Sequence, residues 1–186
     1  MTQAHVLVIG GSGMLAGLCE HLAREGDRVS VVGRDSVKLQ HVADRVPGHI
    51  VPLSLDYRKE RAFCDALSVR AEAYGRPRRT VCWAHEDAPD VPLKAAGLVD
   101  GVFWHVLSSA HADPARPDRL AAWRSRFDAL PAIDYRQVIL GFVTDGRGSR
   151  WLTNEEISEG VWQAICNGQA LSIAGTVSPW SMRPAR

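Results

Sequence analysis

The sequence lacks several features that would place a protein in a special class. No stretch of its 186 residues approaches the roughly 20 consecutive apolar residues that a membrane-spanning helix needs. Charge of one sign is not in excess, because 22 basic and 21 acidic residues leave a formal net charge of +1. A balanced charge argues against binding to nucleic acid or to a membrane surface. We therefore expect no nucleic acid and no membrane among the partners.

Cysteine is also scarce, and the four cysteines form no CxxC pair. Widely spaced cysteines in patterned segments are typical of buried, reduced thiols in a cytosolic protein. His105 and His111 do not match a zinc-ligand spacing, so we expect no metal site. The amino-terminal residues 1–11 enter an apolar run without a basic segment, which predicts no secretion signal and a cytoplasmic location.

The pattern that is present is an alternation of short β-branched runs with longer segments of helical periodicity. Such alternation predicts an α/β fold, and the length predicts one domain over residues 1–186. We expect a single doubly wound parallel sheet of the Rossmann-like kind, with strand order 3-2-1-4-5-6 or close to it. Strands are predicted at residues 5–9, 28–32, 49–53, 80–84, 102–107, 137–143 and 170–174. Helices are predicted at residues 14–25, 36–46, 59–74 and 113–130, with a last one that starts at a capping box of Thr153 and Glu156.

A glycine-rich segment lies between the first predicted strand and the first predicted helix. Its Gly11-x-Gly13-x-x-Ala16 spacing fits the G-x-G-x-x-G/A fingerprint of dinucleotide-binding loops. Glycines let the backbone approach a diphosphate closely, and the helix N-terminus supplies free N–H groups. The cofactor-binding residues expected here are Gly10, Gly11, Ser12, Gly13, Met14 and Leu15. The alternative is a tight turn in a fold that has lost its ligand.

Arg34 follows the second predicted strand, where an acidic residue that holds the adenosine ribose is expected in NAD-binding proteins. A guanidinium at this place would pair with a 2′-phosphate, and Lys38 could assist it. We therefore favour NADP over NAD as the cofactor. Asp35 is expected to cap the next helix. The alternative for Arg34 is a solvated turn residue.

The order of these motifs resembles that of the short-chain dehydrogenase/reductase family. The glycine loop, the arginine after strand two, Leu-Asp-Tyr at 55–57 and Ser-Ser at 108–109 follow one another as in that family. The resemblance implies that Asp56 contacts the adenine and that Ser109 is the catalytic serine. It also implies that the loop containing Ala84 lines the nicotinamide ribose, although this loop does not read like the family's usual Asn-Asn-Ala-Gly.

One family motif is missing. Members carry a Tyr-x-x-x-Lys pair on the helix after strand five, and the usual spacing from Ser109 leads to Ala122 and Arg126. None of the three tyrosines is followed four residues later by lysine. A proton donor for carbonyl reduction would then be His85 or a bound water, with His111 as a further loop candidate. Both histidines could equally be loop residues without a role, and we interpret His105 as a core residue.

The sequence thus favours an NADP(H)-binding oxidoreductase that acts on an unidentified small carbonyl or hydroxyl compound. The expected partners are the dinucleotide, this small molecule and further copies of the chain in a homo-oligomer. A non-catalytic NADP-binding redox sensor or regulator is the main alternative, because it needs no Tyr-x-x-x-Lys pair. A scaffold with a decayed pocket is a third.

Overall fold

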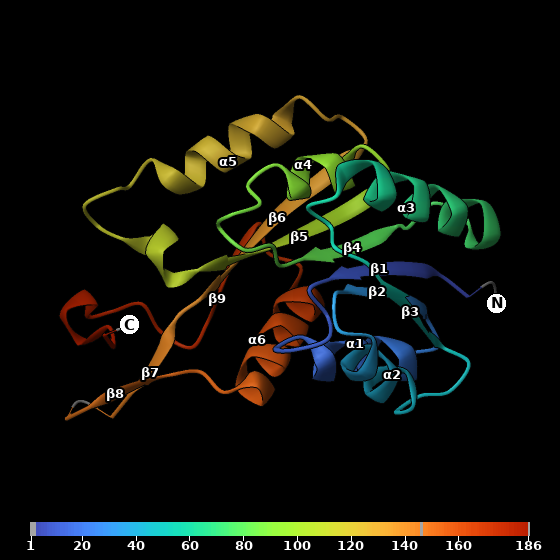
Figure 1. Ribbon diagram of the computed structural model, residues 1–186. Coiled ribbons are helices and arrows are strands. Elements are labelled where there is room, and N and C mark those ends of the chain that lie inside the picture. The colour runs from blue at the N-terminus through green and yellow to red at the C-terminus, as the bar shows by residue number, and fades with distance from the viewer. Residues whose placement is uncertain (1–2, 146, 186) are drawn as a thin grey trace.

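A computed structural model describes residues 3–145 and 147–185 of the chain. Its centre is a seven-stranded sheet with the order β3-β2-β1-β4-β5-β6-β9, in which every pair is parallel (Figure 1). The strands are β1 (His5–Ile9), β2 (Arg28–Gly33), β3 (Ile50–Ser54), β4 (Arg79–Cys82), β5 (Gly101–Ser108), β6 (Ile133–Leu140) and β9 (Leu171–Ala174). The expected doubly wound fold and strand order are confirmed, and β9 extends the sheet beyond β6.

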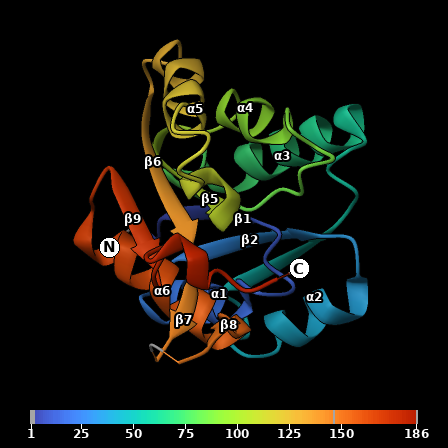
Figure 2. The same ribbon diagram turned by 90° about the vertical axis from the view of Figure 1, so that its left-hand side faces the viewer.

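Helices cover both faces of this sheet. On one face lie α3 (Glu60–Tyr74), α4 (Val91–Ala96) and α5 (Arg119–Asp128); on the other lie α1 (Ala16–Arg24), α2 (Ser36–Ala43) and α6 (Asn154–Asn167) (Figures 1 and 2). A two-sided cover explains why the central strand β1 is buried along its whole length. No helix within the described residues is long and apolar enough to cross a bilayer.

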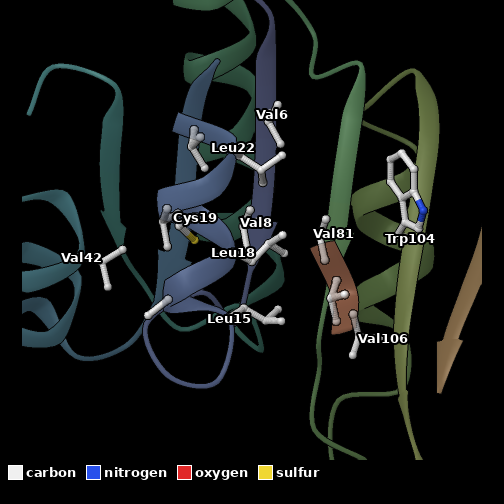
Figure 3. Close-up of a cluster of buried hydrophobic side chains, with 14 of the residues drawn as sticks. Val6, Val8, Leu15, Leu18, Cys19, Leu22, Val42, Val81, Trp104 and Val106 are labelled. Atoms are coloured by element: carbon white, nitrogen blue, oxygen red, sulfur yellow. The ribbon is translucent and has the colours of Figure 1, made fainter. Parts of the chain in front are cut away.

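The core follows from the periodicity of the sequence. On α1 and the residue before it, Leu15, Leu18, Cys19 and Leu22 recur at helical spacing, and all four are buried. Figure 3 shows these side chains facing the valines of the strands beneath them. A second apolar cluster fills the opposite face, below α3, α4 and α5. The two clusters fix the sheet, and with it the loops at its carboxyl edge.

The sheet order reverses at β1, which pairs with β2 on one side and with β4 on the other. In open α/β sheets, ligands bind outside the carboxyl ends of the strands at such a switch point. The loops after β1, β4 and β5 meet at this edge, and they contain the glycine-rich segment and most other predicted site residues. The candidate site is therefore expected at this edge.

The carboxyl-terminal third differs from the prediction. The strand predicted at 137–143 begins earlier, at Ile133, and ends at Leu140. After Gly141 the chain forms β7 (Phe142–Thr144), which pairs antiparallel with an unpredicted β8 (Ser149–Trp151). Gly141 interrupts the strand because its N–H donates to the Ala174 carbonyl and its backbone lies against Thr176, which leaves no room for a side chain.

The long helix predicted at 113–130 is also shorter than expected. A 3-10 turn, η1 (Ser109–Ala112), comes first, and α5 begins only at Arg119. Pro114 and Pro117 lie between the two elements, and proline lacks the N–H that a helix interior needs. The predicted capping box of α6 is confirmed, since Thr153 and Glu156 exchange their side-chain to backbone hydrogen bonds. A second 3-10 turn, η2 (Trp180–Met182), lies near the carboxyl terminus.

Candidate functional site

The loop between β1 and α1 is built on closely packed glycines. Gly10 has a φ of +79°, and a Cβ at this position would lie 2.6 Å from the carbonyl oxygen of Trp83. A Cβ at Gly11 would lie equally close to the Val31 side chain, whereas one at Gly13 would meet nothing within 4 Å. Gly10 and Gly11 therefore allow the loop to pack closely against its neighbours. The absence of a side chain at Gly13 leaves the outer side of the loop open.

The loop leaves several main-chain donors free. Gly10 N–H donates to Val32 and Ala16 N–H donates to Gly13, but the hydrogen bonds among the described residues include none from the amides of residues 11–14. The residue before α1, Leu15, provides no side-chain cap. The amides and the positive end of the helix dipole therefore remain available, which is the arrangement that binds a diphosphate.

Helix α6 holds this loop from below. The Ser158 hydroxyl donates to the carbonyl oxygen of Met14 over 2.7 Å. Gly17 lies so close to Ser158 that a Cβ there would be 3.0 Å from the serine's Cβ. The conformation of the glycine loop thus depends on a helix that follows it by more than a hundred residues.

At the end of β2, Arg34 is exposed and its guanidinium forms no hydrogen bond or ion pair among the described residues. Asp35 accepts a hydrogen bond from Lys38 N–H over 3.0 Å and so caps α2, as expected. The Asp56 carboxylate accepts hydrogen bonds from Arg58, one of them from the side chain at 2.8 Å. The hydrogen bonds from Arg58 lower the pKa of Asp56 to about 2. Of the three, Arg34 has the charge most available for a ligand.

A cavity of about 340 Å³ joins the glycine loop to the end of β5. Met14 lines it from the loop, Ser108 and Ser109 from the end of β5, and Leu140 from β6. Ser109 is buried, and its Oγ accepts a hydrogen bond from Arg183 Nε over 2.9 Å. The expected catalytic serine therefore does lie beside the expected cofactor loop.

A larger cavity of about 570 Å³ lies next to the first, and Trp83 and Ser108 line both. Ala84, His85 and His111 line the larger cavity, so the predicted loop residues meet at one place. Its other lining residues include Glu86, Arg119, Trp123 and His105. The two histidine loops and the serine are thus brought to one edge of the sheet.

The two candidate histidines differ in their surroundings. The His85 side chain is exposed. His111 is half-buried, and desolvation lowers its pKa below the ordinary histidine value, while the hydrogen bond of its ring to the Ser108 carbonyl acts in the opposite direction. The lowered pKa favours the neutral form of the His111 ring, which lines the larger cavity.

His105 and Tyr135 are core residues. The His105 ring contacts the Tyr135 hydroxyl at 2.9 Å, and Tyr135 stacks on Phe127 with ring centroids 3.9 Å apart. On α5, Ala122 and Arg126 are both exposed. Instead of a tyrosine, α5 directs Trp123 into the larger cavity. Among the described residues, no three His, Cys, Asp or Glu side chains are placed to hold a metal ion.

Sequence reasoning missed the contribution of the carboxyl-terminal segment. Trp151 and Arg183 both line the smaller cavity, and Trp180 lies beside Arg183. The local sequence gives no periodicity or motif that would place these side chains near Ser109. The sequence offers only the residue types themselves, because Trp180 and Arg183 are side chains that can contact a ligand.

Comparison with protein-family models and with curated proteins finds no match. Solved structures do match. A metagenomic short-chain oxidoreductase in complex with NADP has a TM-score of 0.68 at 17% identity, over 95% of this chain and 98% of the other. The bulky-bulky ketone specific alcohol dehydrogenase from Comamonas testosteroni has a TM-score of 0.73 at 14% identity, over 97% and 90%.

An alcohol dehydrogenase from Thermococcus sibiricus, complexed with 5-hydroxy-NADP, matches over 99% of this chain and 100% of the other, with a TM-score of 0.72 at 15% identity. Similarity at this level of identity establishes architecture and not chemistry. The expectation raised by the order of the sequence motifs is confirmed for the architecture: the chain has the fold of the short-chain dehydrogenases/reductases.

Proposed function

We propose that the protein binds NADP(H) and acts as an oxidoreductase on a small carbonyl or hydroxyl compound. The glycine loop fits the cofactor, because its amides at residues 11–14 and the open side of Gly13 can receive a diphosphate. The guanidinium of Arg34, which has no partner among residues 3–145 and 147–185, would hold a 2′-phosphate. Asp56 and Ala84 are the further residues proposed to contact the cofactor. Bound NADPH supplies a hydride to a carbonyl carbon.

The observation that carries the proposal is the pair of adjoining cavities at the carboxyl edge of the sheet. The smaller one contacts the glycine loop at Met14, and the larger one contains no residue of that loop. Because Trp83 and Ser108 line both, a group in one cavity would be next to a group in the other. A protein that binds the cofactor without catalysing a reaction would not need a second cavity for a substrate.

The residues of this edge have distinct roles in the proposal. Ser109 would donate its hydroxyl hydrogen to the oxygen of a carbonyl substrate. Ser109 does not ionise in the working pH range, so the proton must come from elsewhere. His85 is a proposed proton donor, and His111 or a water bound near it is the other source at this edge.

One observation favours a second candidate, a non-catalytic NADP-binding regulator. Helix α5 carries Ala122 and Arg126 at the places where the resemblance requires tyrosine and lysine. Tyr135 cannot replace the tyrosine, because it lies on β6 and is buried against Phe127 of α5.

The test is NADPH consumption with a panel of aldehydes, ketones and quinones, with Gly13→Asp as the control. A Cβ at Gly13 would meet nothing within 4 Å, so aspartate should be accommodated and would put a negative charge where a diphosphate would lie. We expect turnover by the wild type and none by this variant at equal thermal stability. NADPH binding without any turnover would instead support the regulator, and no NADPH binding would refute both.

A further inference from the structure

Arg183 is held in place by two tryptophans from different parts of the chain. Its guanidinium carbon lies 5.0 Å from the ring centroid of Trp151 on β8 and 5.2 Å from that of Trp180 on η2. Both distances fall within the range of a cation–π interaction, which is strongest with tryptophan. The carboxyl-terminal segment thus carries a positive charge to the smaller cavity and fixes it there.

This charge has no anionic partner within the part of the chain that the structure describes. The one hydrogen bond of the Arg183 side chain goes to the neutral Ser109 hydroxyl, and the ion pairs include none with Arg183. Among the residues that line the smaller cavity, Arg183 is the sole ionisable one. A partly buried cation in an otherwise neutral and largely apolar cavity is stabilised when an anion enters.

The smaller cavity also offers hydroxyl groups that can donate hydrogen bonds to an anion. A guanidinium N–H can only donate, so Ser109 Oγ is the acceptor and its own hydrogen is free to donate. Ser108 Oγ is buried and has no hydrogen-bond partner among the described residues. Buried polar atoms are normally paired, and Ser108 lines the same cavity as Arg183, so a ligand in this cavity would give the hydroxyl a partner.

We propose that Arg183, Ser109 and Ser108 form a subsite for an oxyanion. Two sources have this chemistry: the carboxylate of a substrate, or a phosphate oxygen of a dinucleotide. The subsite does not depend on turnover, but its assignment to a substrate carboxylate deepens the proposed function and rests on it. In that case the substrate class is narrowed to oxo acids and hydroxy acids.

The test is a fluorine NMR titration of trifluoroacetate with the full chain, and trifluoroethanol serves as the neutral probe. We expect saturable line broadening of trifluoroacetate with the wild type. Arg183→Gln should weaken this binding about tenfold or more, since charge-assisted hydrogen bonds are lost. Arg183→Lys keeps the charge and should bind between the two. Arg147→Gln is the matched control, because Arg147 is exposed and lies outside both cavities, and it should bind as the wild type does.

Repeating the trifluoroacetate titration in the presence of saturating NADP distinguishes a substrate carboxylate from a phosphate of the dinucleotide. Displacement of trifluoroacetate by NADP would assign the subsite to a phosphate of the dinucleotide, and simultaneous binding would assign it to a substrate carboxylate. NADPH binding is measured separately by its fluorescence, so failure of the proposed function is visible independently of the subsite.

Two results would overturn the subsite: no saturable trifluoroacetate binding by the wild type, or equal binding by Arg183→Gln and the wild type. If Arg183→Gln proves unfolded by circular dichroism, Ser109→Ala takes its place. That variant should weaken trifluoroacetate binding, and unchanged trifluoroacetate binding would count against the proposal.

Discussion

Arg34 illustrates a residue whose role depends on what it does not contact. Its neighbours along the chain are engaged, since Asp35 caps α2, and Asp56 at the end of the next strand is held by Arg58. Arg34 itself is exposed and unpaired among the described residues. An exposed guanidinium at this place is compatible with a contact to a 2′-phosphate, and that contact stays a prediction.

Replacement of Arg34 tests the choice between NADP and NAD. Arg34→Ala should weaken NADP binding about ten- to a hundredfold, because a charge-assisted contact contributes roughly 1.5–3 kcal/mol. NAD binding should change little. Isothermal titration of both dinucleotides measures the two dissociation constants, with Arg61→Ala, which removes an almost fully exposed arginine, as the control. An equal loss for NADP and NAD would show that Arg34 does not contact the 2′-phosphate.

The burial of His105 predicts how the free energy of unfolding depends on pH. Burial lowers the pKa of His105 to about 3, whereas an unfolded histidine titrates near 6.5. Between these values the unfolded chain binds a proton that the folded chain does not, so the free energy of unfolding falls as the pH drops below about 6.5. This one residue should contribute a slope of up to about 1.4 kcal/mol per pH unit.

Urea denaturation from pH 7.5 to 5 checks this slope. His105→Gln should show a smaller pH dependence than the wild type, whatever its absolute stability, because the buried titrating group is gone. His41→Gln, a change at an exposed position of α2, should keep the wild-type dependence. The same pH dependence in His105→Gln and the wild type would contradict the assignment.

At the scale of elements, helix α6 carries both a stabilising capping box and a contact to the glycine loop. Its first turn is closed by the capping box of Thr153 and Glu156, and Glu156 also accepts from the Arg150 side chain at 2.7 Å. One turn further, Ser158 holds the Met14 carbonyl. The capping box and the contact to the glycine loop thus lie within the first two turns of the same helix.

Thr153→Ala should lower the free energy of unfolding by about 1 kcal/mol, because a helix N-terminal donor loses its partner. Ser68→Ala on the exposed side of α3 should have no comparable effect. Urea denaturation of the two variants and the wild type measures the difference. Equal stability of Thr153→Ala and the wild type would show that water replaces the cap without cost.

The elements that sequence predicts well are those with strong periodicity. The strand order, the glycine loop and the capping box of α6 all follow from local patterns, and the structure contains them. β8 and the contact between Arg183 and Ser109 could not be predicted. That contact joins residues 74 positions apart, and it depends on cation–π geometry that leaves no periodic signal.

At the scale of the molecule, the predicted site residues come together at one edge of one sheet. The glycine loop follows β1, Arg34 follows β2, and Ala84 and Ser109 follow β4 and β5. Parallel strands have their carboxyl ends at the same edge, so residues distant in the sequence become neighbours. The expected homo-oligomer stays a prediction.

A ligand that spans this edge should stabilise the whole domain. At a concentration about 100-fold above its dissociation constant, NADPH should add about 2.7 kcal/mol to the free energy of unfolding. Thermal melting with NADPH, NADH and FAD side by side measures the effect. We expect the largest shift with NADPH, a smaller one with NADH and none with FAD. Absence of a shift with every dinucleotide would favour a scaffold with a decayed pocket.

Trp83 stands in the wall between the two cavities. An indole at such a boundary is a built-in optical reporter, since its emission depends on the polarity and on the energy acceptors around it. Filling of either compartment would change this emission without any attached dye. Subtraction of the spectrum of a Trp83→Phe protein would isolate that signal from the other five tryptophans.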